Sequence, residues 1–391
     1  MTFIPSVSVV VIGGGVVGTA ILHALAHRGV DALLLERESD LAYAASGTNS
    51  GILHTGFDST PGELETQLIL RAARLRAEIL PALGVPVLPC GAVLSPRAEG
   101  DDTVIADLAA NAAANGVATE RRGSDGALLV PGESVTDPVA FTLALAASAR
   151  AAGARIELDA PVVGLDDHGE EMTVRLADGR TVRAAAVINA AGLHADDVAR
   201  LVGDETFEIY PRKGEFFVFE VPVTHRLDSI LLPLPTKRTK GVLVFPTLDG
   251  RVVTGPTAVD LLDKEDWSVR PEAREEILAK ARAAFPALER LEPVAQYAGL
   301  RPAGRDANYV IGASDSCARL INVAAIRSTG LSASLGIGAY VAEMLPELGL
   351  DVDHVRPAVP VVSRAVRPEW WRRTAARFAE VGRASSGRVT R

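Results

Sequence analysis

The sequence predicts a mixed α/β and α+β fold, in which a parallel-sheet domain is assembled from separated segments and a second, antiparallel sheet is inserted between them. Three observations predict it. Strand, helix and strand alternate within the first 36 residues. From residue 207, short alternating runs separated by Pro and Gly replace this pattern. Near residue 297 the glycine-rich α/β pattern returns. The predicted divisions are 1–84, 135–205 and 298–362 for the first domain, 85–134 and 206–297 for the second, and 363–391 for a basic tail.

The N-terminal segment has the layout of a Rossmann-like dinucleotide-binding unit. An apolar run, Val7–Ile12, is followed by Gly13-Gly14-Gly15-Val16-Val17-Gly18, a helical stretch and a second apolar run that ends on Glu36. The first glycine of this motif permits a tight turn, the second lets the backbone approach a pyrophosphate, and the third lets the helix pack close to the strand. Glu36 stands where an acid binds ribose hydroxyls, which argues against NADP. The alternative is a purely structural glycine turn.

The remaining elements follow from periodicity. A polar loop of small residues spans 44–51 and a small-residue segment ends a strand at 186–192, where a ligand can come close. Helices are expected over 62–79, 101–122, 139–152, 272–285 and 335–345. Strands are expected within 155–188 and over 215–221, 241–246 and 251–255.

Composition narrows the class of function. A chain of 391 residues suits two domains, and its net charge of −9 makes nucleic acid an unexpected partner. Two cysteines fit a reducing cytoplasm and are too few for a thiolate metal site, so no metal is expected. No apolar run reaches 18 residues and no basic–apolar leader opens the chain, so neither a membrane span nor a secretory signal is expected. His23 and His27, four residues apart, are interpreted as surface residues.

The last 28 residues are basic, with eight Arg and two Glu, and they include Trp370, Trp371 and Phe378. This mixture fits peripheral contact with an anionic membrane, or contact with a partner. A solvated terminal helix is the favoured alternative. The predicted location is therefore cytoplasmic, with membrane-peripheral association left open.

Four further segments carry recognisable motifs: SGTNSGILHTG at 46–56, PRKGEF at 211–216, GVLVFPT with GPTA at 241–258, and IRSTGLSA at 326–333. As a set they resemble the D-amino-acid-oxidase-like (DAO) superfamily of flavoenzymes, and within it the branch of glycerol-3-phosphate dehydrogenase and L-2-hydroxyglutarate oxidase. Phe57-Asp58 departs from an Ile-Tyr-Tyr-like stretch of the hydroxyglutarate oxidases, which leaves the substrate open.

The resemblance implies FAD as the cofactor. Backbone N–H groups of Gly330, Leu331 and Ser332, at the start of the last helix, are expected to face the flavin pyrimidine. The full set of expected FAD-binding residues is Gly13, Gly15, Val16, Val17, Gly18, Glu36, Arg37, Ser46, Thr48, Asn49, Ser50, Gly51, Val162, Ala191, Gly192, Gly330, Leu331 and Ser332.

Four residues are candidates for substrate chemistry. His54 has a side chain whose pKa is ordinarily near neutrality and which can accept a hydroxyl proton, although packing against the flavin is an equal alternative. A guanidinium binds a carboxylate through two parallel hydrogen bonds, so Arg301 and Arg327 are expected to anchor the substrate; a structural salt bridge is the alternative. Lys213 is a weaker candidate for the same anion, and a solvent-facing position is the alternative.

The sequence therefore predicts an FAD-dependent oxidoreductase acting on the CH–OH carbon of a small anionic substrate, carboxylate or phosphate. A 2-hydroxy acid such as L-2-hydroxyglutarate is favoured, followed by glycerol-3-phosphate and by an amino acid or secondary amine. A non-catalytic flavin-binding or electron-relay subunit is the alternative from another class. The electron acceptor, whether oxygen, a quinone or an electron-transfer protein, stays open, as do covalent attachment of FAD and the oligomeric state.

Overall fold

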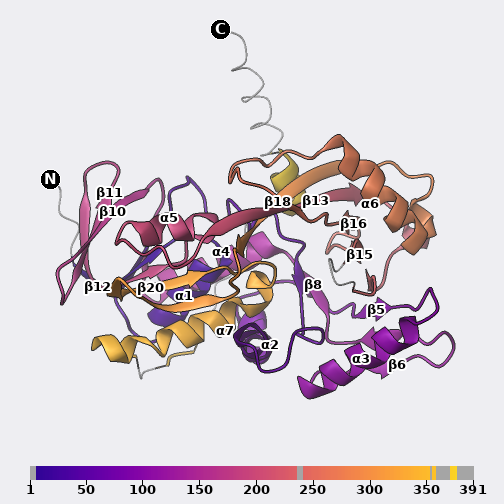
Figure 1. The fold of residues 1–391 in the computed structure, drawn as a ribbon, viewed down its shortest axis with the longest axis horizontal. Helices are drawn as coiled ribbons and strands as arrows, with labels where there is room; N and C mark the ends of the chain where they lie inside the picture. Colours follow the sequence, from indigo (N-terminus) through magenta and orange to yellow (C-terminus); the bar gives the residue numbers. More distant parts are fainter. Residues whose placement is uncertain (1–5, 236–240, 353–354, 358–369, 377–391) are drawn as a thin grey trace, which may run out of the picture.

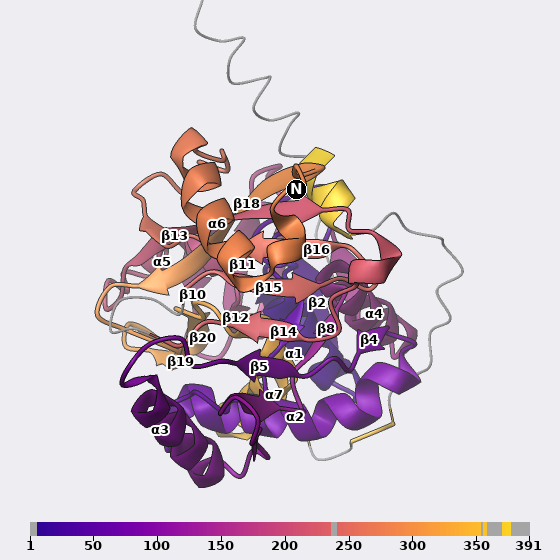
Figure 2. The same ribbon diagram turned by 90° about the vertical axis from the view of Figure 1, so that its right-hand side faces the viewer.

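Two sheets lie side by side in the computed structural model, which describes residues 6–235, 241–352, 355–357 and 370–376. Figure 1 shows the eight-stranded sheet with α1 and α7 in one half of the molecule, and the nine-stranded sheet with α3 and α6 in the other. The view at right angles in Figure 2 shows β13, β16, β15, β14 and β5 following one another across the second sheet.

The eight-stranded sheet has the order β10-β11-β12-β1-β2-β9, and β20 joins it through β12. Strands β12, β1, β2 and β9 are parallel neighbours, as expected for a dinucleotide-binding unit. The strands are β1 (Val7–Ile12), β2 (Ala32–Leu35), β9 (Arg155–Glu157), β10 (Val162–Asp167), β11 (Met172–Leu176), β12 (Thr181–Asn189), β19 (Val310–Ser314) and β20 (Cys317–Ala324).

Alternating residues of β1 serve two separate cores. Val9 and Val11 pack beneath helices α1 and α7, whereas Val10 and Ile12 pack on the opposite face with residues of β10, β11 and β12. Burial on both faces explains why this strand is a continuous apolar run and not an alternating one. The helices of this half are α1 (Val16–Ala26), α2 (Leu64–Ala82), α4 (Pro138–Ala151), α5 (Ala195–Arg200) and α7 (Gly330–Ala342).

The nine-stranded sheet is mostly antiparallel. Its longest pairing joins β13 to β18 over ten residue pairs, from Ile209 opposite Gly304 to Val218 opposite Ala295. Helix α6 packs against β16 and β13 through Ile277 and Ala281. The strands are β5 (Ala92–Leu94), β6 (Glu120–Arg121), β7 (Leu128–Val130), β13 (Ile209–Phe219), β14 (Ile230–Leu232), β15 (Leu243–Pro246), β16 (Val252–Gly255), β17 (Val259–Asp260) and β18 (Ala295–Gly304).

Smaller elements connect the two halves. A third sheet of order β3-β8-β4 joins the loop after the first unit to the entry of α4. Its strands are β3 (Ile52–Leu53), β4 (Val87–Leu88) and β8 (Ser134–Thr136), and the helices beside the second sheet are α3 (Asp101–Ala114) and α6 (Pro271–Ala284). Short 3₁₀ segments in the described part of the chain are η1 (Gly192–His194), η2 (Val223–His225), η3 (Pro286–Leu288) and η4 (Leu345–Leu348).

Three expectations about the elements were wrong in detail. The helix expected over 101–122 ends at Ala114, because Gly116 adopts φ +68 and Val117 N–H bonds back to Ala112, as in a glycine-terminated helix end. The last long helix begins at Gly330 and not near 335. The boundary expected at 298 falls inside β18, whose whole length pairs with β13.

His23 and His27 were expected on the surface, but both are buried, at 5% and 3% exposure. Their rings lie 4.3 Å apart on the face of α1 that packs against α4, where Ser148 contacts His27 Nε2 at 3.0 Å. The two histidines are buried because α4 and α7 both cover α1, which leaves the helix little exposed surface. The sequence of α1 does not show which distant helices cover it.

The described part of the tail docks onto the protein. Residues 370–376 are helical, and Trp370 and Trp371 are 3% and 4% exposed within the apolar cluster of the second sheet. Trp371 Nε1 donates to Asp249 at 3.3 Å. These two tryptophans are therefore not available to a membrane, contrary to that interpretation of the tail, while Phe378 lies outside the described residues. Within the described residues, no helix is long and apolar enough to cross a membrane.

Candidate active site

A cavity of about 910 Å³ lies between the two sheets, and most of the predicted FAD-binding residues line it. The glycine turn after β1 borders one part of it, and Arg301 and Arg327 border another. The lining members of the predicted set are Gly13, Gly15, Val16, Val17, Glu36, Arg37, Ser46, Thr48, Asn49, Ser50, Val162, Ala191, Gly192, Gly330 and Leu331.

Close backbone approach accounts for the glycines of the first turn. Gly13 adopts φ +111, and a Cβ there would collide with the carbonyl of Ala190. Gly18 does not line the cavity. A Cβ at this position would collide with the carbonyl of Gly13, so this glycine permits close packing of α1 against the turn. The N-terminus of α1 borders the cavity at Gly15, Val16 and Val17, a position that suits a pyrophosphate.

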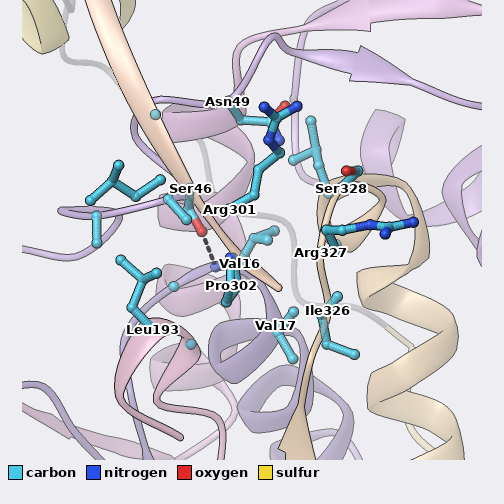
Figure 3. A pocket seen from close by; sticks show the side chains of 18 of the residues that line it. Val16, Val17, Ser46, Asn49, Leu193, Arg301, Pro302, Ile326, Arg327 and Ser328 are labelled. Carbon is cyan, nitrogen blue, oxygen red and sulfur yellow. Dashed lines mark hydrogen bonds between the residues drawn. The ribbon is translucent and has the colours of Figure 1, made fainter. Parts of the chain in front are cut away.

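Side chains from later segments complete the walls of this part. Ser46 Oγ accepts the N–H of Val16 at 2.9 Å, as the dashed line in Figure 3 shows. Glu36 Oε2 accepts the N–H of Gly14 at 2.5 Å, and burial raises the pKa of this carboxyl. Arg37 lines the cavity but is paired with Glu265 at 3.0 Å, so a loop of the second sheet closes over this end.

Two other predicted cofactor residues have structural roles. Gly51 adopts φ +80, and a Cβ there would collide with the carbonyl of Thr136. Ser332 Oγ accepts the N–H of His54 at 2.8 Å and donates to the carbonyl of Ile52 at 3.4 Å, which joins α7 to β3. Neither residue lines the cavity.

His54 lies on the cavity wall with one nitrogen held by the protein. Its Nδ1 is 2.9 Å from Glu133 Oε2, a side chain with no exposed surface. Nε2 has no hydrogen-bond partner among the described residues, and the His54 side chain is 20% exposed. Arg76 Nη2 donates to the backbone carbonyl of His54 at 3.0 Å and supports the loop from the side of α2. Sequence reasoning missed Glu133, because it is distant along the chain and belongs to none of the motifs.

Arg301 is held in a fixed orientation by three backbone carbonyls. Its Nε donates to the carbonyl of Arg212 at 3.1 Å, and Nη2 donates to the carbonyls of Lys213 and Thr257 at 3.1 and 2.7 Å. Nη1 has no hydrogen-bond partner within the described chain. Burial, followed by the positive charges of Arg212 and Arg327, lowers the pKa of Arg301 to about 10, so the group is cationic at neutral pH. Within the described part of the chain, neither Arg301 nor Arg327 forms a salt bridge, which was the alternative interpretation of both.

Arg327 is an exposed residue of the cavity wall, in the turn before α7. Figure 3 shows Arg327 and Ser328 on the strand-to-helix connection, and Arg301 with Asn49 on the opposite wall. Arg212 also lines the cavity, but Asp260 binds it at 2.5 and 2.8 Å, which neutralises its charge. Arg301 and Arg327 are therefore the cavity-lining arginines that have no carboxylate partner among the described residues.

Lys213 lies away from the cavity, where contact with the substrate anion was expected, and it does not face solvent, which was the alternative. Its side chain has no exposed surface, does not line the cavity, and pairs with Asp266 at 2.8 Å. Nζ also donates to the carbonyl of Ser268 at 3.0 Å. Lys213 follows Arg212 in β13, and successive side chains of a strand point to opposite faces, so Lys213 faces away from the cavity.

The fold and the cavity are those of a dinucleotide-binding protein in which a second sheet borders the cavity. The chain belongs to the DAO family of FAD-dependent oxidoreductases, whose family model matches residues 8–344. FAD is thus the cofactor of this enzyme family, and the glycine turn, Glu36 and the long cavity fit it. This confirms the expected family, fold class, enzyme class and cofactor.

Curated relatives divide between two substrates. The chain is 29% identical over 362 residues to a glycerol 3-phosphate dehydrogenase of Caloramator mitchellensis, covering 88% of this chain and 75% of the relative. It is 30% identical over 278 residues to an L-2-hydroxyglutarate dehydrogenase of Escherichia coli, covering 67% of this chain and 66% of the relative.

Solved structures share the fold. A dithionite-reduced L-alpha-glycerophosphate oxidase of Mycoplasma pneumoniae with FAD bound superposes with a TM-score of 0.81 at 24% identity, covering 88% of this chain and 95% of that one. A glycine oxidase of Geobacillus kaustophilus superposes with a TM-score of 0.78 at 22% identity, covering 93% of this chain and 100% of that one. At these identities the likeness concerns the fold alone.

Proposed function

We propose that the protein oxidises the CH–OH carbon of a small anionic 2-hydroxy acid, with L-2-hydroxyglutarate as the leading example. One observation carries the proposal: a histidine with a free nitrogen and two cationic side chains share the cavity that the glycine turn opens onto. A base and an anion anchor are the two groups that the oxidation of a hydroxy acid requires from the protein.

Each of the three side chains has a separate role in the proposed reaction. Arg301 presents Nη1 to a carboxylate, because its other nitrogens are engaged by backbone carbonyls that hold the guanidinium still. Arg327 offers a second cationic contact from the turn before α7. His54 takes the hydroxyl proton at Nε2. FAD, when bound, supplies the acceptor for the hydride.

Glycerol 3-phosphate is the second candidate. The similarity to the glycerol 3-phosphate dehydrogenase extends over 362 residues, compared with 278 for the hydroxyglutarate dehydrogenase. Its hydroxyl and its phosphate present the same demands, a base and a cationic anchor. The identities of 29% and 30% do not separate the two substrates.

Anaerobic titration of the FAD-loaded protein tests the proposal. The visible flavin bands are followed while L- and D-2-hydroxyglutarate, lactate, glycerol-3-phosphate, proline, sarcosine and glycine are added separately. Bleaching by L-2-hydroxyglutarate is the expected result, and bleaching by glycerol-3-phosphate alone selects the second candidate. Bleaching by amines alone contradicts CH–OH oxidation. A flavin that no member of the panel reduces contradicts both candidates and favours a relay role.

A further inference from the structure

A buried carboxylate lies directly behind the candidate base. Glu133 stands in the turn between β7 and β8 and has no exposed surface. Its Oε1 accepts the N–H and the hydroxyl of Thr55 at 2.6 and 2.8 Å, and its Oε2 lies 2.9 Å from His54 Nδ1. A carboxylate only accepts hydrogen bonds, so Nδ1 carries the proton and Nε2 keeps its lone pair. This is the tautomer that a base facing the cavity requires.

The charges around this pair leave His54 as the partner of the carboxylate. Arg76 of α2 lies close enough to interact electrostatically with Glu133, but it donates its hydrogen bonds to the carbonyls of His54 and Ser332. Cys90 interacts electrostatically with Glu133, and burial raises the pKa of this thiol to about 11, so it is neutral. On the cavity side, Glu65 and Asp58 share the wall with His54. Among the described residues, His54 is the titratable side chain that donates directly to Glu133.

We propose that Glu133 is the positioning residue of the base: it fixes the tautomer of His54 and stabilises the cation that forms on it. In the step, the substrate O–H bond breaks and the proton bonds to His54 Nε2. The O–H electron pair forms the C=O bond as the hydrogen on the carbinol carbon leaves with its own electron pair, a hydride that FAD, when bound, would accept. The imidazolium then faces the Glu133 carboxylate, which has been oriented in advance by two hydrogen bonds from Thr55. This inference rests on the proposed function.

The first test observes His54 directly and needs no substrate. The FAD-loaded full-length protein, labelled with ¹⁵N-histidine, is observed by NMR, and His54→Gln identifies the signal. The neutral wild-type ring is expected to carry its proton on Nδ1. In Glu133→Gln the neutral ring is expected to divide between the Nδ1 and Nε2 tautomers, because an amide can donate to Nδ1 as well as accept from it. A wild-type ring protonated on Nε2 overturns the proposal even if the variant does not fold.

The second test measures flavin reduction by the substrate found in the panel. Glu133→Gln is expected to reduce the rate constant by about 10²–10⁴-fold, with little change in half-saturation. Asp204→Asn is the matched control: Asp204 is also buried and accepts from Ser314 and Asn322, but it does not line the cavity. It is expected to retain the wild-type rate.

The outcomes separate the two proposals. If Glu133→Gln leaves both the His54 tautomer and the rate unchanged, Glu133 is structural and this inference is wrong. If the tautomer changes as expected but the flavin of His54→Gln is reduced at the wild-type rate, the base of the proposed function is wrong, and with it the catalytic part of this inference. A slow Glu133→Gln in which the His54 tautomer is unchanged also refutes the positioning role.

Discussion

Helix α7 is packed so closely that a single methyl group should destabilise the protein. It lies between α1 and α2, and it meets them through Gly338 and Gly336, which are two residues apart and so lie on opposite faces of a helix. A Cβ on Gly338 would lie 2.6 Å from the carbonyl oxygen of Ala20, whereas ordinary contact begins at 3.4 Å. The helices must therefore separate by about 0.8 Å.

Two effects oppose each other in Gly338→Ala. Alanine favours a helix over glycine by about 1 kcal/mol. Overpacking costs about 1–3 kcal/mol, and the upper value applies because the obstacle is backbone that no rotamer change relieves. The net loss is about 2 kcal/mol, which at roughly 2 °C per kcal/mol lowers the melting temperature by about 4 °C. Gly336→Ala should lower it further, because its Cβ would come closer still to the carbonyl of Leu68.

Thermal unfolding of the FAD-loaded protein, followed by circular dichroism and by flavin release, measures this effect. Gly312→Ala in β19 is the control, because a Cβ there meets no atom within 4 Å and the backbone is not left-handed. Its melting temperature should stay within about 1 °C of the wild type. If Gly338→Ala melts at or above the wild-type temperature, the close approach of α7 and α1 is not a constraint and the reasoning is refuted.

Three further predictions concern the anchor, the buried histidines and the tail. Arg327→Ala should raise the half-saturating concentration of the anionic substrate about tenfold, which corresponds to the loss of one charge-assisted contact of roughly 1.4 kcal/mol. The melting temperature of the protein should not fall, because Arg327 is exposed. An unchanged half-saturating concentration would exclude the contact. Burial, followed by the charges of His27 and Arg28, lowers the pKa of His23 from 6.5 to about 3. As the pH falls from 6.5 toward 3, the unfolded protein binds a proton at His23 and the folded protein does not. The free energy of unfolding should therefore fall over this range, by up to about 1.4 kcal/mol per pH unit. His23→Gln should weaken this dependence between pH 7 and 5 in urea unfolding, and identical slopes would contradict it. Trp370→Ala should destabilise the protein by about 3 kcal/mol, and an unchanged urea midpoint would show that the tail is not part of the core.

The sequence predicted those parts of the site that depend on neighbours along the chain. The strand, glycine turn, helix and terminal acid of the first 36 residues form a unit whose conformation depends on local geometry and backbone sterics, and the turn and Glu36 line the cavity as expected. The loop at 46–50 and the turn at 330–331 were found in the same way, because a motif preserves the spacing of its residues.

Tertiary structure alone decided which distant side chains meet. His54 and Glu133 are 79 positions apart, and no local pattern links them, because their contact depends on how β3 and β8 pair. The orientation of Arg301 depends on carbonyls of β13 and of the segment before β17, and the same sheet turns Lys213 toward Asp266 and away from the cavity. Local sterics fix a turn wherever it occurs, whereas the partner of a buried charge is chosen by the packing of the whole chain.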